Sequence, residues 1–373
     1  MRIALDARLT HYSSGGISEY IRQLARRLPA LDSQNQYLIL HAHKDAGRLP
    51  LPGGARVAKC FTPAHHSLER SALTLELLPR RLRLLHSPDF IAPRGGPWRS
   101  VITIHDLTFL RFPQFLTPQS LRYYNHQIGA SVRRADAILA DSDATHSDIL
   151  ELLRVPPKKV TTVHLAADER FFPQPEEVVA SARARLELPH HYLLFVGTFE
   201  PRKNIPTLLH AYADLRSRHA DAPPLLLAGN PGWLFESTDA LLGELGLRGA
   251  VTFRSNLPAE DLPALYTGAT ALILPSYYEG FGFPVLEAMA CGTATIIAER
   301  ASLPEIAGDA ALSCDPDRPE SITEAMSRVL FDDSLRTTLG QKGLQRADEF
   351  SWEKCCTQTL KVYRRVLGQV EAA

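Results

Sequence analysis

Short apolar runs alternate with amphipathic stretches along the chain, and this alternation predicts βα units built around parallel sheets. The apolar runs contain few interspersed polar residues, which is typical of strands buried on both faces. Helical patterns between the runs include residues 17–28 and 120–135. The predicted strands lie at residues 2–8, 37–43, 84–87, 101–105, 137–142 and 160–165, and then at residues 192–198, 225–230, 251–256, 271–276 and 293–298.

The strands fall into two series, and the segment between them resembles a linker. Residues 171–189 contain three prolines and an acidic pair. A chain of 373 residues corresponds to about two domains at roughly 150 residues each. We therefore predict an α/β protein with two doubly wound sheets joined near residue 175.

The overall composition is that of an ordinary folded protein, with 45% hydrophobic and 22% charged residues. Lys+Arg and Asp+Glu both number 41, and this zero net charge argues against a general role in coating polyanions. Residues 1–170 nevertheless hold 23 basic and 15 acidic residues, whereas residues 171–373 hold 18 and 26. Either one face meets an anionic partner or both halves are simply solvated, and composition leaves both readings open.

The cysteines and the apolar runs together predict a cytoplasmic location. The five cysteines form no CxxC pair and no Cys/His zinc spacing, which favours a reducing compartment. No run approaches the ~18 apolar residues of a membrane-spanning helix. The first residues, MRIALDARL, are typical of a buried strand, because the apolar run is too short for a signal peptide.

Two loops in the first half are candidates for binding an anion or a sugar. Gly15 and Gly16 open a predicted helix, where backbone amides can approach a ligand, although a plain turn is the alternative. His105 ends a predicted strand and can donate to a phosphate or a sugar hydroxyl. The alternative for His105 is a hydrogen bond to a backbone carbonyl.

The first strand–helix junction of the second half carries two adjacent cations. Gly197 follows the strand, Arg202 and Lys203 follow in the loop, and Asn204 is a candidate cap of the next helix. Cations at such a junction can neutralise a diphosphate leaving group. A solvated basic turn is the alternative reading.

The segment 274–296 gives the clearest prediction of a site. Glu279 lies in a glycine-rich loop, Pro284 suits the first turn of the following helix, and Glu287 falls in its opening turns before Gly292 ends it. The glycines let backbone amides face a phosphate, and each carboxylate can accept two hydroxyl hydrogen bonds, as a diol requires. We expect Glu279 and Glu287 to point into one crevice.

Two acidic patterns are interpreted as structural. Asp141-Ser142-Asp143 has the DxD form of metal-dependent sugar transferases, but it lies where a helix cap is expected. Asp315-Pro316-Asp317 has the composition of a turn. No P-loop, nucleophile elbow, HExxH or GxGxxG motif occurs. We therefore expect neither a metal nor a cofactor, and the missing glycine fingerprint argues against a dehydrogenase.

Together these residues resemble the family-four retaining glycosyltransferases. The resemblance runs from residues 3–16 to residues 350–367, and its most specific part is YYEGFGFPVLEAMACG (277–292), followed by LPEIAGDAAL. It implies a GT-B fold, with two Rossmann-like doubly wound domains that face an interdomain cleft. The implied acceptor-binding domain is 1–175, joined by a returning helix at 353–373, and the implied nucleotide-sugar-binding domain is 188–352.

The same resemblance implies roles for individual residues. It assigns Glu279 to the transferred sugar and Glu287 to the ribose of the nucleotide, whereas His105 contacts the sugar and Lys203 pairs with the phosphates. His105, Lys203 and Glu279 are the implied catalytic residues. Other implied nucleotide-sugar-binding residues are Gly15, Gly16, Gly197, Gly280, Phe281, Gly282, Phe283 and Pro284. Many relatives carry an Arg where this chain has Thr198, and we expect Arg202 to supply the missing charge.

The implied activity is retaining, metal-independent transfer of a hexose onto a glycan or lipid-linked glycan. VGTFEPRKN and VHLAADERFF most resemble bacterial mannosyl- or rhamnosyltransferases of surface-polysaccharide assembly, which indicates a GDP-sugar. A UDP-sugar donor and a non-catalytic nucleotide-sugar-binding regulator are the alternatives. Nucleotide-sugar epimerisation is a further possibility within the fold, and phosphorolysis is disfavoured because nothing resembles a pyridoxal-phosphate lysine site.

A basic, leucine-rich stretch at residues 67–86 suggests a membrane contact in the first domain. Arg70, Arg80, Arg81 and Arg83 lie there among many leucines. This composition suits docking to an anionic membrane that carries a lipid-diphosphate-linked acceptor. The alternative is a helix packed on the sheet with its basic face in water.

Overall fold

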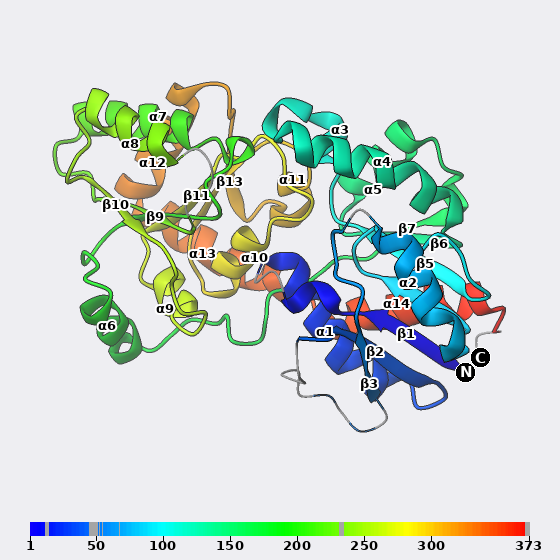
Figure 1. Cartoon of the computed structure of the whole chain (residues 1–373). Helices are drawn as coiled ribbons and strands as arrows, with labels where there is room; N and C mark the ends of the chain where they lie inside the picture. The colour runs from blue at the N-terminus through cyan, green and yellow to red at the C-terminus, as the bar shows by residue number, and fades with distance from the viewer. Residues whose placement is uncertain are drawn as a thin grey trace. The chain divides into compact units, whose positions relative to one another are not determined.

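The chain folds into two compact α/β units, shown in Figure 1 as a computed structural model. The structure describes residues 1–11, 15–44, 51, 53, 55–66, 68–230 and 235–369. The first unit comprises Met1–Leu165 and Ser351–Ala373, and the second comprises Ala166–Phe350. Each unit holds its own parallel sheet, so the predicted class of two doubly wound sheets is confirmed.

The first unit contains, among its described residues, a seven-stranded parallel sheet in the order β3-β2-β1-β4-β5-β6-β7. Its strands are β1 (Arg2–Asp6), β2 (Gln36–Ala42), β3 (Ala55–Cys60), β4 (Leu84–Ser87), β5 (Arg99–Ile104), β6 (Ala137–Ala140) and β7 (Val160–Thr162). Its helices are α1 (Gly16–Leu31), α2 (Glu69–Leu77), α3 (Thr108–Arg111), α4 (Pro118–Arg134), α5 (Asp143–Leu153) and α14 (Trp352–Leu367).

Helix α14 comes from the far end of the sequence but packs on the first sheet, against α1 and near β5 and β6. Its buried positions recur every three or four residues, for example at Trp352, Cys355, Cys356 and Thr359, so one stripe of the helix faces the sheet. The hydroxyl of Tyr363 lies 2.6 Å from Nδ1 of His86 on β4. The C-terminal helix therefore completes the core of the first unit.

The second unit contains, over its described part, a six-stranded parallel sheet in the order β10-β9-β8-β11-β12-β13. Its strands are β8 (Leu193–Val196), β9 (Leu225–Ala228), β10 (Val251–Arg254), β11 (Ala271–Leu274), β12 (Thr295–Ala298) and β13 (Ala311–Cys314). Its helices are α6 (Glu176–Arg185), α7 (Ile205–Arg218), α8 (Phe235–Glu244), α9 (Leu262–Thr267), α10 (Phe283–Ala290), α11 (Leu303–Ala307), α12 (Pro319–Phe331) and α13 (Asp333–Asp348).

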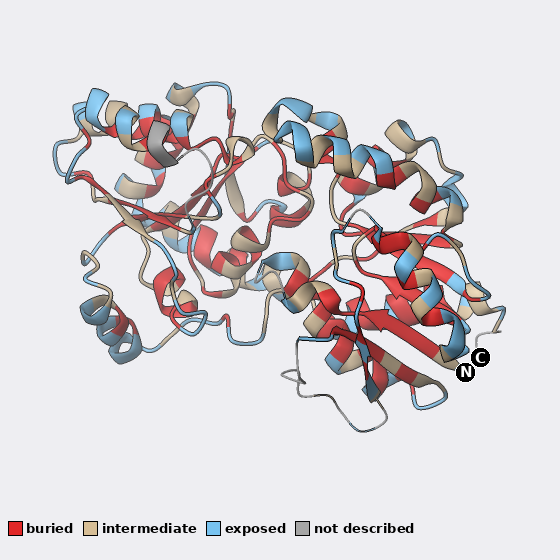
Figure 2. Cartoon of the chain, in the orientation of Figure 1, coloured by how far each residue is buried: buried red, intermediate tan, exposed pale blue. Residues whose placement is uncertain are grey.

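Burial follows the sequence pattern closely in the central strands. Figure 2 shows the strands mostly buried, whereas many helices carry one buried and one exposed face. β4, β6, β9, β11 and β12 are buried at every position. Each of these strands has a neighbouring strand on both sides, and burial of both faces is why their sequences are largely apolar.

Two strands and one helix differ from the sequence-based expectation. β3 and β13 were not among the predicted strands; they are the outermost strands of their sheets, and their half-exposed positions give no continuous apolar run. The expected linker at residues 171–189 instead contributes α6 to the second unit, where Val179 and Ala182 are buried and the helix packs against α9.

Candidate donor and sugar site

The predicted residues of the second unit gather where the strand order reverses. β8 and β11 are neighbours, with β9 and β10 on one side and β12 and β13 on the other. Ligands of open α/β sheets bind outside the carboxyl ends of strands at such a point. Gly197 directly follows β8, and the loop that carries Glu279 follows β11, so both predicted segments lie at this edge.

Glu279 forms the centre of a charge cluster with both predicted cations. Its Oε1 lies 2.6 Å from Nζ of Lys203, and its Oε2 lies 2.6 Å from Nη1 of Arg202. Glu279 and Lys203 are buried, with exposed fractions of 6% and 5%, whereas Arg202 is half-buried. Arg202 also contacts Glu200 through Nε at 2.9 Å. One carboxylate therefore contacts two cations at the carboxyl ends of β8 and β11.

The surroundings of this cluster keep Glu279 ionised. Burial by itself would raise the pKa of Glu279, but Arg202 and Lys203 outweigh it and lower that pKa to about 2. Burial lowers the pKa of Lys203, and Arg202 adds to this effect, while Glu279 opposes it. We take the cluster as charged at neutral pH, because each carboxylate oxygen of Glu279 has a cationic donor.

The loop that carries Glu279 is fixed by backbone contacts. Oγ of Ser302 donates to the carbonyl oxygens of Glu279 at 2.8 Å and of Phe281 at 2.9 Å. Gly282 has a φ of +106°, and a Cβ there would come within 2.8 Å of Cδ2 of Leu303. A side chain at position 282 would therefore face both backbone strain and a clash, so this position requires glycine.

The loop then leads directly into α10. The helix begins at Phe283 with Pro284 in its first turn, as predicted, and ends at Ala290 just before Gly292, whose φ is +73°. Phe281 packs edge-on against Phe283, with ring centroids 5.4 Å apart, and half-buried Gly280 precedes it.

Glu287 is held separately from Glu279. It is half-buried on the second turn of α10, and its Oε2 accepts a hydrogen bond of 2.7 Å from the hydroxyl of Tyr266 on α9. The structure gives no contact between the two glutamates, so their convergence on one ligand stays a prediction. Sequence analysis missed Tyr266, because an isolated tyrosine in an apolar helix carries no motif.

A second glycine that sequence analysis missed faces Gly197. The two follow the neighbouring strands β8 and β9, and a Cβ on Gly229 would lie 2.0 Å from the carbonyl oxygen of Gly197. Gly197 itself has a φ of +156°, and a Cβ there would meet Cε of Lys203 at 3.3 Å. The run LLLAGN contains the only sequence signal for Gly229, a glycine directly after a strand.

Asn204 does not act as the predicted side-chain cap. It precedes α7, but with a φ of +59° it makes no side-chain cap hydrogen bond. Its Nδ2 donates to the carbonyl oxygens of Pro275 at 3.2 Å and Pro316 at 2.7 Å. Asn204 thus ties the cation loop to the end of β11 and to the turn at residues 315–317, where a turn was predicted.

His105, in the first unit, has partners for both ring nitrogens. Nδ1 lies 2.6 Å from Oδ2 of Asp141, and Nε2 lies 2.6 Å from the carbonyl oxygen of Pro88. Burial would lower the pKa of His105, but Asp141 overcomes it and the pKa rises to about 9. His105 is therefore an imidazolium at neutral pH, and a sugar hydroxyl would have to replace the Pro88 carbonyl.

Neutral aromatic and polar groups pack around His105. The ring of Tyr20 meets it edge-on at 5.2 Å, and the Tyr20 hydroxyl lies 3.0 Å from Oγ1 of Thr103. His86 contacts the same Thr103 oxygen at 2.8 Å, and burial together with nearby His105 lowers its pKa to about 3. Of this pair, only His105 carries charge.

The remaining predicted residues of the first unit are partly described. Gly16 opens α1 and Gly15 precedes it, both exposed, whereas residues 12–14 lie outside the described part. Ser142 caps α5 by accepting from the backbone N of Thr145 at 3.0 Å, so the capping interpretation of the DxD pattern is confirmed for Ser142.

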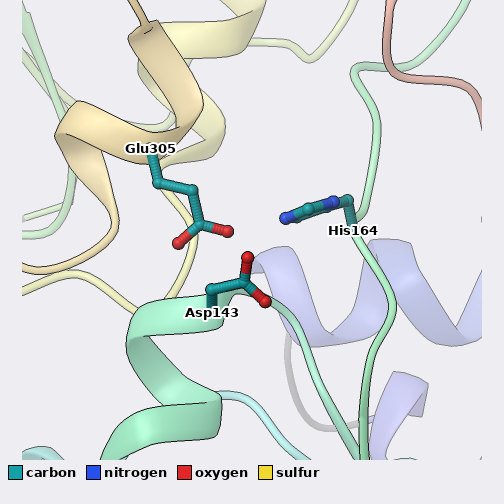
Figure 3. A group of neighbouring side chains, drawn as sticks. All are labelled: Asp143, His164 and Glu305. Carbon is teal, nitrogen blue, oxygen red and sulfur yellow. The ribbon is translucent and has the colours of Figure 1, made fainter.

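Figure 3 shows three side chains of types that can ligate a metal, Asp143, His164 and Glu305. Asp143 and His164 belong to the first unit and Glu305 to the second, so neither unit contains the whole group. Asp143 also accepts a hydrogen bond of 2.6 Å from Oγ1 of Thr162. The group gives no metal site within either unit.

Comparison with known proteins identifies the family. Residues 14–171 match the family described as Glycosyltransferase Family 4, and residues 181–346 match Glycosyl transferases group 1. The O-antigen chain mannosyltransferase B of Escherichia coli is 33% identical, over 98% of this chain and 100% of its own. The chain belongs to the family-four glycosyltransferases.

Two further relatives support this glycosyltransferase assignment. The serotype-specific mannosyltransferase WbdA of E. coli is 31% identical over 73% of this chain, which spans about a third of that longer protein. The solved structure of sucrose-phosphate synthase from Thermosynechococcus elongatus has a TM-score of 0.80 and 23% identity, and the match covers 99% of each chain. The latter likeness confirms the GT-B fold.

Proposed function

We propose that this glycosyltransferase moves a mannosyl or closely related hexosyl group from a GDP-sugar to a surface-polysaccharide acceptor, with retention of configuration. The named activities of the two E. coli mannosyltransferases support the sugar and the acceptor class. The transfer reaction itself is supported by one observation. Arg202 and Lys203 both contact one buried carboxylate at the ends of β8 and β11.

The charge cluster can exchange one anion for another. Cleavage of a sugar–diphosphate bond leaves negative charge on the phosphate oxygens, and two fixed cations stabilise that charge. In the cluster, Glu279 pairs with both Arg202 and Lys203, and Glu200 also pairs with Arg202. An incoming diphosphate replaces the carboxylate on the cations, and the freed carboxylate can then accept hydrogen bonds from the sugar, the role that family resemblance implies for Glu279.

His105 does not act as the base in this scheme. An imidazolium whose pKa is near 9 holds its proton at neutral pH, so it cannot take one from the acceptor hydroxyl. We therefore propose front-face attack, in which the acceptor oxygen bonds to the anomeric carbon as the leaving phosphate departs. The departing phosphate oxygen takes the acceptor proton.

Ligand-induced stabilisation tests the donor assignment. A ligand that binds the folded chain raises its melting temperature by mass action. We expect GDP and GDP-mannose to raise it more than UDP or ADP and their sugar conjugates. Glu287→Ala should abolish most of that shift, whereas Glu320→Ala, on the exposed start of α12, is the matched control and should keep it.

Each outcome of this panel distinguishes one of the readings. A shift with UDP and UDP-sugars alone would keep the reaction and replace the donor. Acceptor-dependent release of free nucleoside diphosphate then tests catalysis directly. Nucleotide-sugar binding without such release, across lipid-linked and free glycan acceptors, would favour a non-catalytic regulator and overturn the proposed activity.

We also propose peripheral contact of the first unit with an anionic membrane. Leu68, Leu75 and Leu78 are 66%, 70% and 46% exposed along α2 and its end. Arg81 and Arg83 are exposed nearby in sequence, although Arg70 is buried and is not part of that surface. Among the described residues, no helix combines the length and apolar character needed to cross a membrane. Failure to float with anionic vesicles would overturn this contact.

A further inference from the structure

A strongly basic pocket lies in the first unit, and none of its lining residues is assigned above to the donor or the sugar. Its volume is about 550 Å³, and its wall includes four arginines, one histidine and one buried glutamine: Arg70, Arg94, Arg133, Arg134, His126 and Gln127. Its lining includes no acidic residue. We call this set the arginine pocket.

Three separate segments build the arginine pocket. Arg70 lies in the first turn of α2, Arg94 in the connection between β4 and β5, and Arg133 near the end of α4. Because these segments are distant in the sequence, the charge concentration is a product of the fold. A run of basic residues on one exposed helix would not enclose a volume in this way.

The arginines are positioned by backbone oxygens. Nε of Arg70, whose exposed fraction is 8%, donates to the carbonyl oxygen of Ala92 at 2.7 Å. The backbone N of Arg94 donates to the carbonyl oxygen of Arg70 at 3.1 Å. Nη2 of Arg134 donates to the carbonyl oxygen of Trp98 at 2.7 Å. These contacts fix the guanidinium groups of Arg70 and Arg134 and the backbone of Arg94, and they leave the charges in place.

The pocket is poorly neutralised compared with other arginines of the same unit. Arg8 has ion pairs of 2.7 Å with both Asp6 and Glu69, and Arg111 reaches Asp148 and Glu151. In contrast, no carboxylate of the described residues lies within 4.0 Å of the guanidinium of Arg70, Arg94 or Arg133. Arg134 has only Asp136, at 3.6 Å.

Like charges in the pocket repel one another, which is a cost that a bound anion would remove. Burial lowers the pKa of Arg70, and the neighbouring guanidinium groups of Arg94 and Arg133 lower it further. The whole first unit is also basic, with 26 Lys and Arg against 15 Asp and Glu, whereas the second unit holds 15 against 26. An anion is therefore attracted to this unit before it reaches the pocket.

We propose that the arginine pocket binds a phosphate or diphosphate group. Guanidinium groups present paired N–H donors that match phosphate oxygens, and several of them converge here on one concave volume. The group is either carried by a lipid or part of a soluble molecule. A lipid-borne diphosphate would belong to the acceptor, and that role rests on the proposed function, whereas the binding of the group to the pocket does not.

Calorimetric titration of pyrophosphate into the full chain tests this site. Arg94→Ala/Arg133→Ala removes two exposed arginines of the pocket, and Arg83→Ala/Arg122→Ala removes two exposed arginines outside it. We expect the pocket variant to bind one pyrophosphate fewer per chain than the wild type and the control variant. This difference holds whether or not the second unit binds a pyrophosphate, so failure of the donor proposal remains distinguishable.

Folding and geometry are controlled in the same experiment. The pocket variant should keep or raise the melting temperature, because it relieves repulsion. Arg94→Lys/Arg133→Lys keeps the charges but loses the paired donors, so it should weaken binding at least threefold without abolishing it. Equal stoichiometry and affinity in the pocket and control variants would overturn the proposal.

Vesicle flotation separates the two sources of the group. Phosphatidylcholine vesicles are prepared with a small fraction of polyprenyl diphosphate or, as a matched control, of the neutral polyprenol. Binding that requires both the diphosphate and the pocket arginines supports a lipid-borne group. Pyrophosphate binding without flotation supports a soluble phosphorylated ligand. If the pocket variant keeps both the pyrophosphate binding and the vesicle binding of the wild type, the proposed site is overturned.

Discussion

Cations are held in two different ways in the two units of this molecule. In the second unit, Arg202 and Lys203 both contact Glu279, and Arg202 also contacts Glu200, so carboxylates offset their charge until another anion displaces Glu279. In the arginine pocket of the first unit, backbone carbonyls position the guanidinium groups of Arg70 and Arg134, and no carboxylate is among the lining residues. Cations paired with a carboxylate suit a ligand that displaces the carboxylate and then develops further charge during the reaction, whereas cations without a close carboxylate are available to an anionic ligand directly.

Removal of Lys203 should have the largest effect. We expect Lys203→Ala to lower kcat by roughly 10²–10³, because a fixed cation at the developing charge is lost. Arg202 remains on Glu279, so the fold should be retained. The measurement is the rate of acceptor-dependent nucleoside diphosphate release at saturating donor. A change confined to KM would show that Lys203 contributes to donor binding and not to stabilisation of the transition state.

Removal of Glu279 tests whether it neutralises the two cations. Glu279→Ala leaves a buried Lys203 and a half-buried Arg202 without their shared partner, which should destabilise the fold by about 3 kcal/mol. Chemical unfolding measures this loss, and a saturating nucleoside diphosphate should restore much of it. Glu200→Ala is the control, since Glu200 contacts only Arg202 of the two and is partly exposed.

His105 and Asp141 extend the comparison of the two units, because here a cation of the first unit is paired with a carboxylate. The folded pKa of His105 is raised to about 9, so its charged form stabilises the fold fully below the unfolded value near 6.5, down to the pH at which Asp141, whose pKa burial raises, takes up a proton. That contribution is lost as the pH rises through 9. Asp141→Asn should therefore cost on the order of 2 kcal/mol at pH 6 and much less at pH 9.5.

Unfolding curves of wild type and Asp141→Asn at several pH values measure this difference. The NMR titration of His105 should show its pKa falling in the variant. A stability difference that stays constant between pH 6 and pH 9.5 would contradict an imidazolium at this position.

The smallest effect is expected for a single arginine of the pocket. Arg133→Ala should change stability by less than about 0.5 kcal/mol, in the stabilising direction at low salt, because it reduces repulsion of Arg70 and Arg94. Salt should reduce the effect, since exposed charges are screened beyond about 8 Å at physiological ionic strength. If Arg133→Ala instead lowered the free energy of unfolding by more than about 1 kcal/mol, Arg133 would stabilise the fold. The arginine pocket would then not differ from the paired cations in the way described.

Local patterns were sufficient for the central strands and for the Glu279 loop. β8 and β11 are continuously apolar because they are buried on both faces, and the glycine and proline of the loop have local backbone requirements at Gly282 and Pro284. The edge strands β3 and β13 were missed because a strand with one neighbour and an exposed face needs no apolar run. The helix α6 was missed because its prolines and acidic pair also fit a linker.

The sequence by itself determined the α/β class and the two sheets, and it singled out the candidate site residues, because each depends on local periodicity or on a contiguous motif. Only the tertiary structure placed Arg202 and Lys203 on Glu279, Tyr266 on Glu287 and Asp141 on His105. It alone gathered Arg70, Arg94 and Arg133 into one pocket. These contacts join residues far apart in the chain, and their charges and burial depend on distances that no local pattern specifies.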